Sequence, residues 1–187
     1  AALLAPALKT AREKAKQIAC MNNLRQFGLA SAAYSDEYDG DLIPCYTASL
    51  SFKVWAQYFP AAGLKFQNWG ELGKDVSPVF ICPTSPMKYG DLGASPMQRF
   101  NYGYNLYLGA NVVYKLAAVN RPAEKPQIMD SALRAGSAWP DRCSYYESDE
   151  STMGFWHAGG ANVLFLDGHV SRHVPGDATA YWFATPP

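Results

Sequence analysis

The sequence predicts an α+β fold in which one long N-terminal helix packs against a small antiparallel sheet with long irregular loops. Apolar residues recur at helical spacing over residues 7–38, whereas the chain after residue 39 consists of short extended runs separated by turn residues. Residues 161–174 add the pattern of a β-hairpin. A helix followed by a run of strands is typical of α+β domains. At 187 residues the chain can bury its own core, so we expect a single domain over 1–187.

Composition and motifs argue against several function classes. The 16 basic and 16 acidic residues balance, so no overall field attracts nucleic acid. The sequence contains no GxSxG elbow, HExxH helix or phosphate-binding glycine loop, and we therefore expect a protein that is not an enzyme. Its four cysteines lack CxxC spacing, which argues against structural zinc. They leave two disulfides open in an oxidising compartment, with three connectivities to choose from.

We expect the helix to cover about residues 6–38 and to carry two apolar stripes. The first stripe comprises Leu8, Ala11, Ala15 and Ile18, and the second comprises Leu24, Phe27, Ala30 and Tyr34. At about 100° per residue the second stripe lies about half a turn around the helix from the first. Leu29 and Ala33 continue the first stripe along the later part of the helix. Such a helix can pack against two partners. Pro6 suits the first turn, and Gly40 is a candidate for a left-handed C-terminal cap.

The charged residues of this helix are mostly placed in the opposite way to that favoured by the helix dipole. Basic residues gather toward its N-terminal end and acidic residues crowd its C-terminal end: Lys9, Arg12, Lys14, Lys16 and Arg25 against Asp36, Glu37, Asp39 and Asp41. One interpretation is a solvated face. The alternative is contact of the charged face with neighbouring subunits or lipid head groups.

The part of the chain from residue 39 to residue 187 is β-rich. Four segments bounded by Pro, Gly or Asn are predicted to be strands: 78–82 (PVFIC), 101–109 (NYGYNLYLG), 126–130 (PQIMD) and 161–167 (ANVLFLD). Segments 83–99 and 132–154 show no regular period and are expected to be irregular. The last strand opens the hairpin near 161–174.

The hairpin contains Asp167-Gly168, a preferred two-residue turn. A two-residue turn places Leu166 opposite His169. His169 and His173 then share one face but lie about 13 Å apart along the strand. That separation is too large for both imidazoles to reach one zinc ion at about 2.1 Å.

All three histidines of the chain, His157, His169 and His173, lie close to Asp167 in the sequence. A metal-dependent hydrolase that uses these four residues is therefore one functional hypothesis. Strand geometry argues against it, because a reversal at Gly159-Gly160 returns His157 toward the middle of the strand and away from Asp167. We interpret Asp167-Gly168 as a turn and His157 as a structural hydrogen-bonding residue, unless a partner from elsewhere in the fold completes a site.

The same stretch resembles a known family. His157, nine intervening residues and Asp167-Gly168 resemble the C-terminal signature of prepilin-type proteins that carry a processing-associated H-X9-DG domain. Residues 3–44 are similar to the segment that follows the membrane-spanning stretch in type II secretion pseudopilin-like proteins. Between these ends, VFICP (79–83), NYGYNLYL (101–108) and NRPAEKPQIMDS (120–131) fall where the family has strands.

The resemblance implies a non-enzymatic subunit of a bacterial type II secretion system, the general secretion pathway of protein transport, or of a pilus-like assembly. The two stripes then belong to an assembly helix that contacts other pseudopilin subunits and secretion components. The globular part is expected in the periplasm or at the cell surface. Family members are anchored in the inner membrane by a hydrophobic segment that a prepilin peptidase processes and that is methylated. No such site precedes the helix in this sequence, so we expect the anchoring segment to lie ahead of Ala1.

The resemblance also suggests covalent and metal sites. It places Cys20 on the helix and Cys82 on the family's Cys-Pro strand, which favours a Cys20–Cys82 disulfide and leaves Cys45–Cys143 to join two loops. Some major pseudopilins bind calcium through loop oxygens. The acidic residues that resemble such ligands here are Asp141, Glu147, Asp149 and Glu150, in a loop that is otherwise a solvated surface loop. We expect no other cofactor.

An alternative function is a recognition module on a pilin-like stem, binding carbohydrate or protein in the periplasm or at the cell surface. Exposed aromatic rings stack on sugars, and five tryptophans are spread along the chain: Trp55, Trp69, Trp139, Trp156 and Trp182. Large aromatic residues are more often part of a core. Their burial in the fold therefore discriminates between the two functions.

Overall fold

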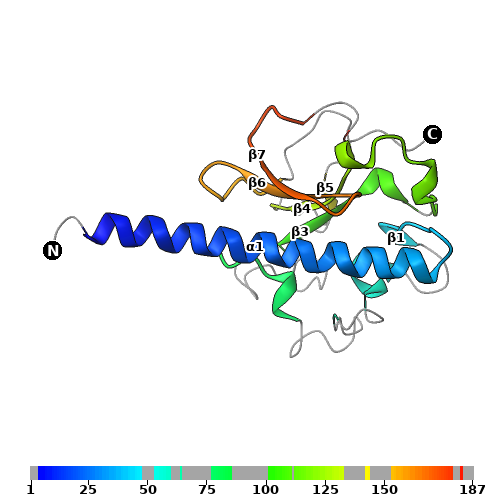
Figure 1. Cartoon of the computed structure of the whole chain (residues 1–187), viewed down its shortest axis with the longest axis horizontal. Coiled ribbons are helices and arrows are strands. Elements are labelled where there is room, and N and C mark those ends of the chain that lie inside the picture. The colour runs from blue at the N-terminus through cyan, green and yellow to red at the C-terminus, as the bar shows by residue number, and fades with distance from the viewer. Residues whose placement is uncertain are drawn as a thin grey trace.

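The computed structural model describes residues 4–47, 53–59, 64, 77–85, 101–110, 112–132, 142–143, 153–178 and 182. One long helix, α1, lies along a twisted sheet, and its N-terminal turns extend beyond the sheet (Figure 1). The predicted α+β class, with a long N-terminal helix on a small antiparallel sheet, is confirmed.

Helix α1 spans Leu4–Glu37, close to the predicted bounds, with Pro6 in its first turn. At its C-terminal end the backbone N–H of Gly40 donates to the carbonyl of Ser35 over 2.7 Å. Both Asp39 and Gly40 have positive φ, 53° and 80°. This is the pattern of a Schellman motif, in which the left-handed cap position is Asp39, one residue before the predicted Gly40.

The acidic C-terminal end of α1 is neutralised by a lysine from another part of the chain. Lys115 Nζ donates to the Asp39 carbonyl over 2.7 Å and lies 3.2 Å from the Asp39 carboxylate and 2.7 Å from that of Asp41. A cation at a helix C-terminus is favourable because the last carbonyls carry partial negative charge. Hydrogen bonds to Asp41 and Asp39 raise the pKa of Lys115.

The main sheet has the strand order β5-β3-β4-β6-β7. Its strands are β3 (Tyr102–Asn105), β4 (Pro126–Asp130), β5 (Arg142–Cys143), β6 (Ala161–Phe165) and β7 (Val170–His173). Strands β3, β4, β6 and β7 are antiparallel, and the two-residue β5 adds a parallel edge beside β3. Strands β1 (Tyr46–Thr47) and β2 (Lys53–Val54) form a separate antiparallel pair. Short 3-10 helices lie at Trp55–Tyr58, Pro78–Phe80, Leu106–Leu108, Leu116–Ala118 and Pro122–Glu124.

The segment 78–82 is not the strand that its apolar run predicted. Pro78–Phe80 form a 3-10 helix, and Ile81, which follows it, is extended. Proline fits the first helical position because its fixed φ suits the turn and its missing N–H needs no partner. The predicted strand at 101–109 is similarly shorter, because the Asn105 side chain accepts a hydrogen bond from the Tyr107 N–H and starts a 3-10 turn.

The hairpin register differs by one residue from the predicted one. Leu164 pairs with Val170 and Val163 with Ser171, so the loop contains three residues, 166–168, rather than two. The Gly168 N–H donates to the Phe165 carbonyl over 2.9 Å, and Gly168 has a φ of 89°. A type I turn followed by a left-handed glycine is the usual three-residue hairpin loop. The predicted pairing of Leu166 with His169 is therefore wrong.

The two faces of the sheet bury separate apolar clusters. On the helix side, Phe27 of α1 is fully buried, and its ring centroid lies 5.1–5.6 Å from those of Trp55, Phe59, Phe80 and Tyr102. The second cluster contains Met129, Met153, Ala161, Val163, Phe165 and Trp182. Because alternate residues of a strand point to opposite faces, Leu164 packs in the cluster that contains α1 whereas its neighbours in β6 pack in the other.

Candidate functional site around His157 and the Cys20–Cys82 disulfide

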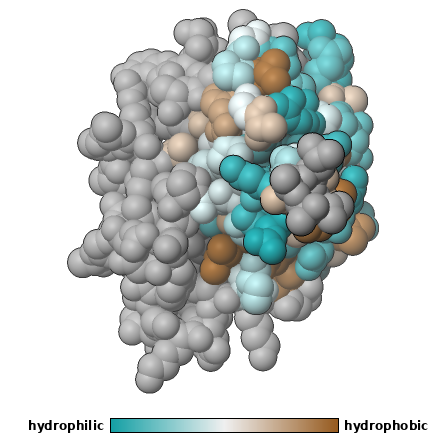
Figure 2. Space-filling model, turned by 90° about the vertical axis from the view of Figure 1, so that its left-hand side faces the viewer, coloured by the Kyte–Doolittle hydropathy of each residue, from teal (hydrophilic) through white to brown (hydrophobic). Residues whose placement is uncertain are grey.

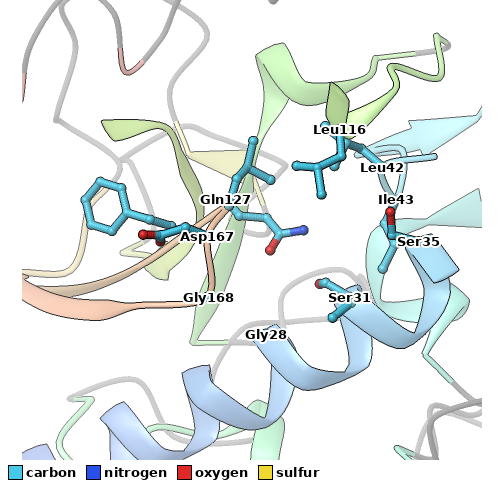
Figure 3. A pocket seen from close by; sticks show the side chains of 12 residues that line it. Gly28, Ser31, Ser35, Leu42, Ile43, Leu116, Gln127, Asp167 and Gly168 are labelled. Atoms are coloured by element: carbon cyan, nitrogen blue, oxygen red, sulfur yellow. The ribbon is translucent and has the colours of Figure 1, made fainter. Parts of the chain in front are cut away.

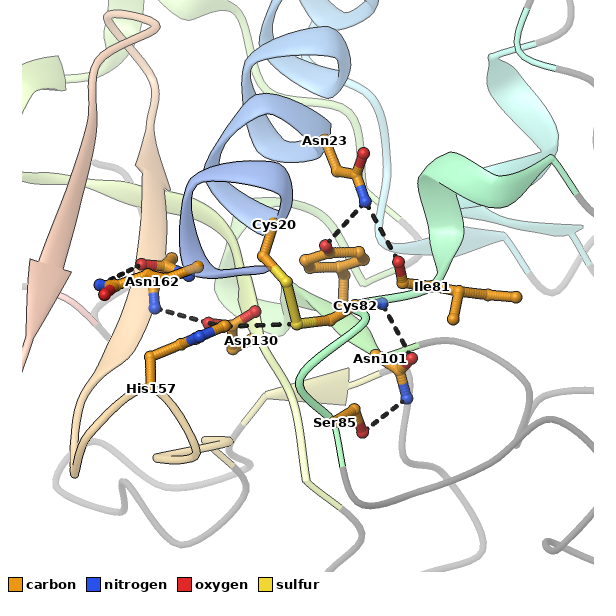
Figure 4. Close-up of a disulfide and its surroundings, with 11 residues drawn as sticks. Cys20, Asn23, Ile81, Cys82, Ser85, Asn101, Asp130, His157 and Asn162 are labelled. Atoms are coloured by element: carbon orange, nitrogen blue, oxygen red, sulfur yellow. Dashed lines mark hydrogen bonds and ion pairs between the residues drawn. A yellow bond between two sulfur atoms is a disulfide. The ribbon is translucent and has the colours of Figure 1, made fainter. Parts of the chain in front are cut away.

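A disulfide joins Cys20 on α1 to Cys82, two residues after the 3-10 helix Pro78–Phe80, as the resemblance suggested. Both residues are buried and their Cα atoms are 5.2 Å apart. The Asn23 amide of α1 donates to the Ile81 carbonyl over 3.1 Å, and the Cys82 N–H donates to the side-chain oxygen of Asn101 over 2.9 Å (Figure 4). Two asparagines therefore fix the strand-like segment that carries Cys82 between α1 and β3.

His157 enters this cluster from a tight turn that precedes β6. His157 and Gly160 exchange both backbone hydrogen bonds, each 3.0 Å long, and the two residues between them have positive φ, 50° at Ala158 and 77° at Gly159. This is a type I′ hairpin turn. Arg172 of β7 braces it by donating to the carbonyls of His157 and Ala158 over 3.2 and 2.7 Å.

The imidazole of His157 is 2 % exposed and makes both of its polar contacts through one nitrogen. Nε2 lies 3.3 Å from Cys82 Sγ and 3.2 Å from Asp130 Oδ2 (Figure 4). Nδ1 is buried and finds no hydrogen-bond partner within the described part of the chain. A Cys-His-Asp triad needs the carboxylate and the sulfur on opposite ring nitrogens, so this cluster does not have triad geometry.

Asp130, the last residue of β4, is the functional-site residue that sequence reasoning missed. It is completely buried and accepts a 2.6 Å hydrogen bond from the Asn162 N–H of β6 as well as facing His157. Desolvation raises the pKa of its carboxyl, and the hydrogen bonds from His157 and Asn162 offset part of that effect. The available signal was an acidic residue that ends the otherwise uncharged strand PQIMD.

Asp167 and Gly168 lie at the opposite end of β6, at the tip of the hairpin. Asp167 Oδ1 accepts from the His169 N–H over 3.1 Å and is 2.6 Å from His169 Nδ1. Although desolvation acts in the other direction, these hydrogen bonds hold the pKa of Asp167 below its usual value. The pair is partly exposed to solvent and is separate from the buried His157–Asp130 pair.

The hairpin tip approaches α1 at Gly28. A Cβ at position 28 would lie 3.0 Å from Leu164 Cδ1 and 3.9 Å from the Gly168 Cα, so a glycine permits the close approach. A small cavity of about 100 Å³ lies beside this contact, lined in part by Ser31, Leu116 and Gln127 (Figure 3). The number of residues from His157 to Asp167-Gly168 is therefore set by strand β6 together with the turn before it and the turn after it. One end meets α1 at Cys20 and the other at Gly28, about 12 Å further along the helix.

The remaining histidines lie on the opposite face of the sheet from α1. His169 stacks on Phe165 with ring centroids 4.3 Å apart. His173 lies against Phe165 and Trp182, and its Nε2 is 2.8 Å from the Ser171 hydroxyl. Only His169 contacts Asp167, whereas His157 and His173 have other neighbours. The structure therefore does not bring the three histidines and Asp167 together in one hydrolase-like site.

Two other sequence-based sites are only partly covered by the described residues. The acidic residues suggested as calcium ligands, Asp141, Glu147, Asp149 and Glu150, lie outside them, as do Trp69 and Trp139. Trp55 and Trp182 are 0 % and 4 % exposed, so neither provides a stacking platform for a sugar. Trp156 is half-buried beside His157.

The second disulfide suggested by the sequence, Cys45–Cys143, is wrong for Cys45. Cys45 is a thiol in the structure, 1 % exposed, with its Sγ 4.0 Å from the Tyr104 carbonyl. It packs in the same apolar cluster as Phe27 and Trp55, where a thiol behaves as a small apolar group. The side chain of Cys143 lies outside the described part.

Residues 9–49 match a family model described as a protein of unknown function (DUF1559), a family associated with prepilin-like and type II secretion pseudopilin proteins. The match covers most of α1 and the turn that follows it. No curated protein and no solved structure matches the chain. Within the described residues, no helix has both the length and the apolar character that a membrane span requires.

Proposed function

We propose that this chain is the globular part of a non-enzymatic, pseudopilin-like subunit of a type II secretion or pilus-like assembly. One observation carries the proposal: α1 has an apolar stripe that its own domain leaves uncovered. The second stripe of the helix meets the sheet, and the first stripe faces away from it. A helix that is apolar on two sides is suited to packing between its own domain and a neighbouring subunit.

The exposure of the two stripes differs sharply. Leu24 and Phe27 are 0 % exposed and Ala30 is 5 % exposed, whereas Leu8, Ile18 and Leu29 are 68 %, 56 % and 74 % exposed. The first stripe also contains Ala11 and Ala15, between Leu8 and Ile18, and Ala33 after Leu29, all exposed. Small side chains between larger ones allow a second helix to approach closely.

The exposed stripe does not extend into a continuous apolar surface. Seen from the end at which the N-terminus lies, apolar and hydrophilic patches alternate over the described part of the molecule (Figure 2). The basic residues Arg12 and Lys14 flank the stripe on its two sides. These side chains would then meet acidic surfaces of a neighbouring subunit or the head groups of a membrane, which is the alternative to a solvated face.

The proposed setting is the periplasm, with the subunit anchored in the inner membrane by a hydrophobic segment ahead of Ala1. The buried Cys20–Cys82 disulfide supports an oxidising compartment. Partners in this setting are other subunits of the same assembly and components of the secretion machinery. The cell surface is the alternative location.

The experiment combines native processing with assembly. Mass spectrometry of the full-length protein from the membrane fraction should find an added apolar segment of roughly 20 residues that begins at a methylated residue. In the same cells, a photo-crosslinking residue at Ile18 should capture a second subunit, and the same residue at the exposed Val113 of the globular part should not.

An Ile18→Glu variant then tests the stripe itself. It should fold as the wild type does, because Ile18 is exposed, and it should fail to assemble. A native protein without an added apolar segment, together with equal crosslinking at positions 18 and 113, would overturn the proposal.

A further inference from the structure

We propose that Cys20, Cys82, His157 and Asp130 form a zinc site when the Cys20–Cys82 disulfide is reduced. The site is distinct from the assembly surface and from any calcium loop. Its residues come from four parts of the chain: α1, the segment after Pro78–Phe80, the turn before β6 and the end of β4. Among the described residues, Cys20, Cys82 and His157 are a buried group whose ligand atoms lie within 4.8 Å of one another.

The distances around His157 Nε2 are those of a coordination shell. Zinc binds nitrogen and oxygen at about 2.0–2.2 Å and thiolate sulfur at about 2.3 Å, so the ligand atoms of a tetrahedral site lie about 3.3–3.8 Å apart. Nε2 is 3.3 Å from Cys82 Sγ and 3.2 Å from Asp130 Oδ2. Once the sulfur–sulfur bond is broken, the two sulfur atoms move apart to that separation by side-chain rotation.

Both contacts lie at the same edge of the imidazole, as neighbouring ligands of one ion would. In a proton-relay arrangement the sulfur and the carboxylate would lie at opposite edges of the imidazole. Here both lie at Nε2, while Nδ1 is left to carry the proton of a neutral, metal-binding histidine. A cavity of about 370 Å³ borders His157, one of the four proposed ligands, together with Thr84 and Gln17.

The charges also suit a divalent soft metal. Two thiolates neutralise one Zn²⁺, and a Cys₂His donor set with one further ligand is common in tetrahedral zinc sites. Arg172, whose guanidinium donates to the carbonyls of His157 and Ala158, fixes the turn that carries the histidine ligand. Hard cations such as Ca²⁺ prefer all-oxygen sites, so this donor set discriminates against them.

The redox step is ordinary thiol–disulfide exchange. A dithiol reductant gives two electrons and two protons to the Cys20–Cys82 bond and becomes a disulfide itself. The two thiols formed then release their two protons when Zn²⁺ binds as a bis-thiolate complex. The disulfide of the oxidised chain and the zinc ion of the reduced chain would in this way hold α1 at the same place, beside Cys82 and His157.

The test is a metal titration of the purified chain in two redox states. The chain is reduced with a phosphine under anaerobic conditions, freed of reductant and titrated with Zn²⁺ against a chromophoric chelator. We expect one equivalent to bind to the reduced chain and none to the oxidised chain at the same site. Co²⁺ in place of Zn²⁺ should give a sulfur-to-metal charge-transfer band together with the visible bands of a tetrahedral ion.

Variants assign the ligands. His157→Ala should weaken binding more than about 100-fold and Asp130→Asn by about 10–100-fold. The matched controls are His169→Ala and Asp167→Asn, which alter the other histidine–aspartate pair, on the exposed turn, and should change nothing. Cys82→Ser should remove the charge-transfer band or reduce it to that of a single thiolate.

Three results would overturn the site. The first is a reduced chain that takes up no more metal than the oxidised chain. The second is zinc binding that is unchanged in His157→Ala. The third is zinc binding to a chain that stays unfolded. If the proposal holds, circular dichroism and hydrogen exchange should instead show that zinc restores the native protection of α1 after reduction.

Discussion

The two halves of α1 have similar apolar patterns but opposite surroundings. From Cys20 onward, Leu24, Phe27 and Ala30 are buried against the sheet, while in the N-terminal half Leu8 and Ile18 are more than half exposed. The difference does not come from the helix itself. It comes from whether the rest of the chain supplies a partner for the stripe, and for the N-terminal half the described domain does not.

The same contrast holds for polar contacts. The C-terminal half is fixed by the disulfide at Cys20, by the amide of Asn23 and by Lys115 at the helix end. Among the described residues, the polar contacts of the N-terminal half are local or weak, such as the exposed Lys16–Glu13 pair and a 3.4 Å contact from Gln17 to Asn162. We therefore infer that the C-terminal half of α1 stabilises the domain through its buried face, while the N-terminal half, together with the exposed Leu29 and Ala33, is available for assembly.

The largest expected effect comes from the centre of the buried half. Phe27→Ala should lower the free energy of unfolding by about 5 kcal/mol, the upper part of the range for buried aromatic residues, because four aromatic rings contact Phe27. Leu8→Ala, its control in the exposed half, should change the free energy by less than about 0.5 kcal/mol. Urea unfolding followed by circular dichroism measures both. Equal losses would show that the two halves contribute alike.

The disulfide should have the next largest effect. The double variant Cys20→Ser/Cys82→Ser opens a cross-link with a sequence separation of 62 residues, for which loop entropy predicts a loss of about 4 kcal/mol. The same urea experiment on the wild type with and without reductant checks this value in a metal-free buffer. A loss below about 1 kcal/mol would mean that packing around Phe27 alone fixes the buried half.

Local patterns were enough to predict the long elements. Helical spacing gave α1 and its two stripes, and the bounded run PQIMD gave β4 at its observed bounds, Pro126–Asp130. The hairpin was also predicted, but its register was not. Asp-Gly is compatible with both a two-residue and a three-residue loop, and the second lets Leu164 face α1 and Phe165 face the other cluster.

The candidate site depended on contacts that the sequence does not encode locally. Its spacing correctly separates His157 from Asp167, but the actual partners of His157 are Asp130 and Cys82, 27 and 75 positions earlier in the chain. Such pairs become visible only when the sheet order is known. The prediction of 78–82 as a strand failed for a different reason, since an apolar run of five residues does not distinguish a buried strand from a 3-10 turn.

A smaller effect is expected where the hairpin tip meets the buried half. Gly28→Leu should lower the free energy of unfolding by about 1–2 kcal/mol. Overpacking against Leu164 costs about 1–3 kcal/mol, and the better helix propensity of leucine returns just under 1 kcal/mol. Ala33→Leu, on the exposed stripe, is the control and should be neutral in thermal unfolding. A destabilised Ala33→Leu variant would indicate that the stripe is covered within the domain.

The smallest effect is a pH dependence from Asp130 of β4, which lies near the disulfide that fixes the buried half of α1 (Figure 4). Burial raises the pKa of Asp130 above its value in the unfolded chain, so the folded state holds this proton more tightly. The stabilisation that results is complete below about pH 4 and is lost as the pH rises through the raised folded pKa. The free energy of unfolding of the wild type, relative to Asp130→Asn, should therefore fall as the pH rises above about 4. Glu13→Gln, an exposed change on the N-terminal half, should leave that slope as it is in the wild type. Parallel curves for wild type and Asp130→Asn would instead mean that the carboxylate of Asp130 is fully compensated by His157 and Asn162.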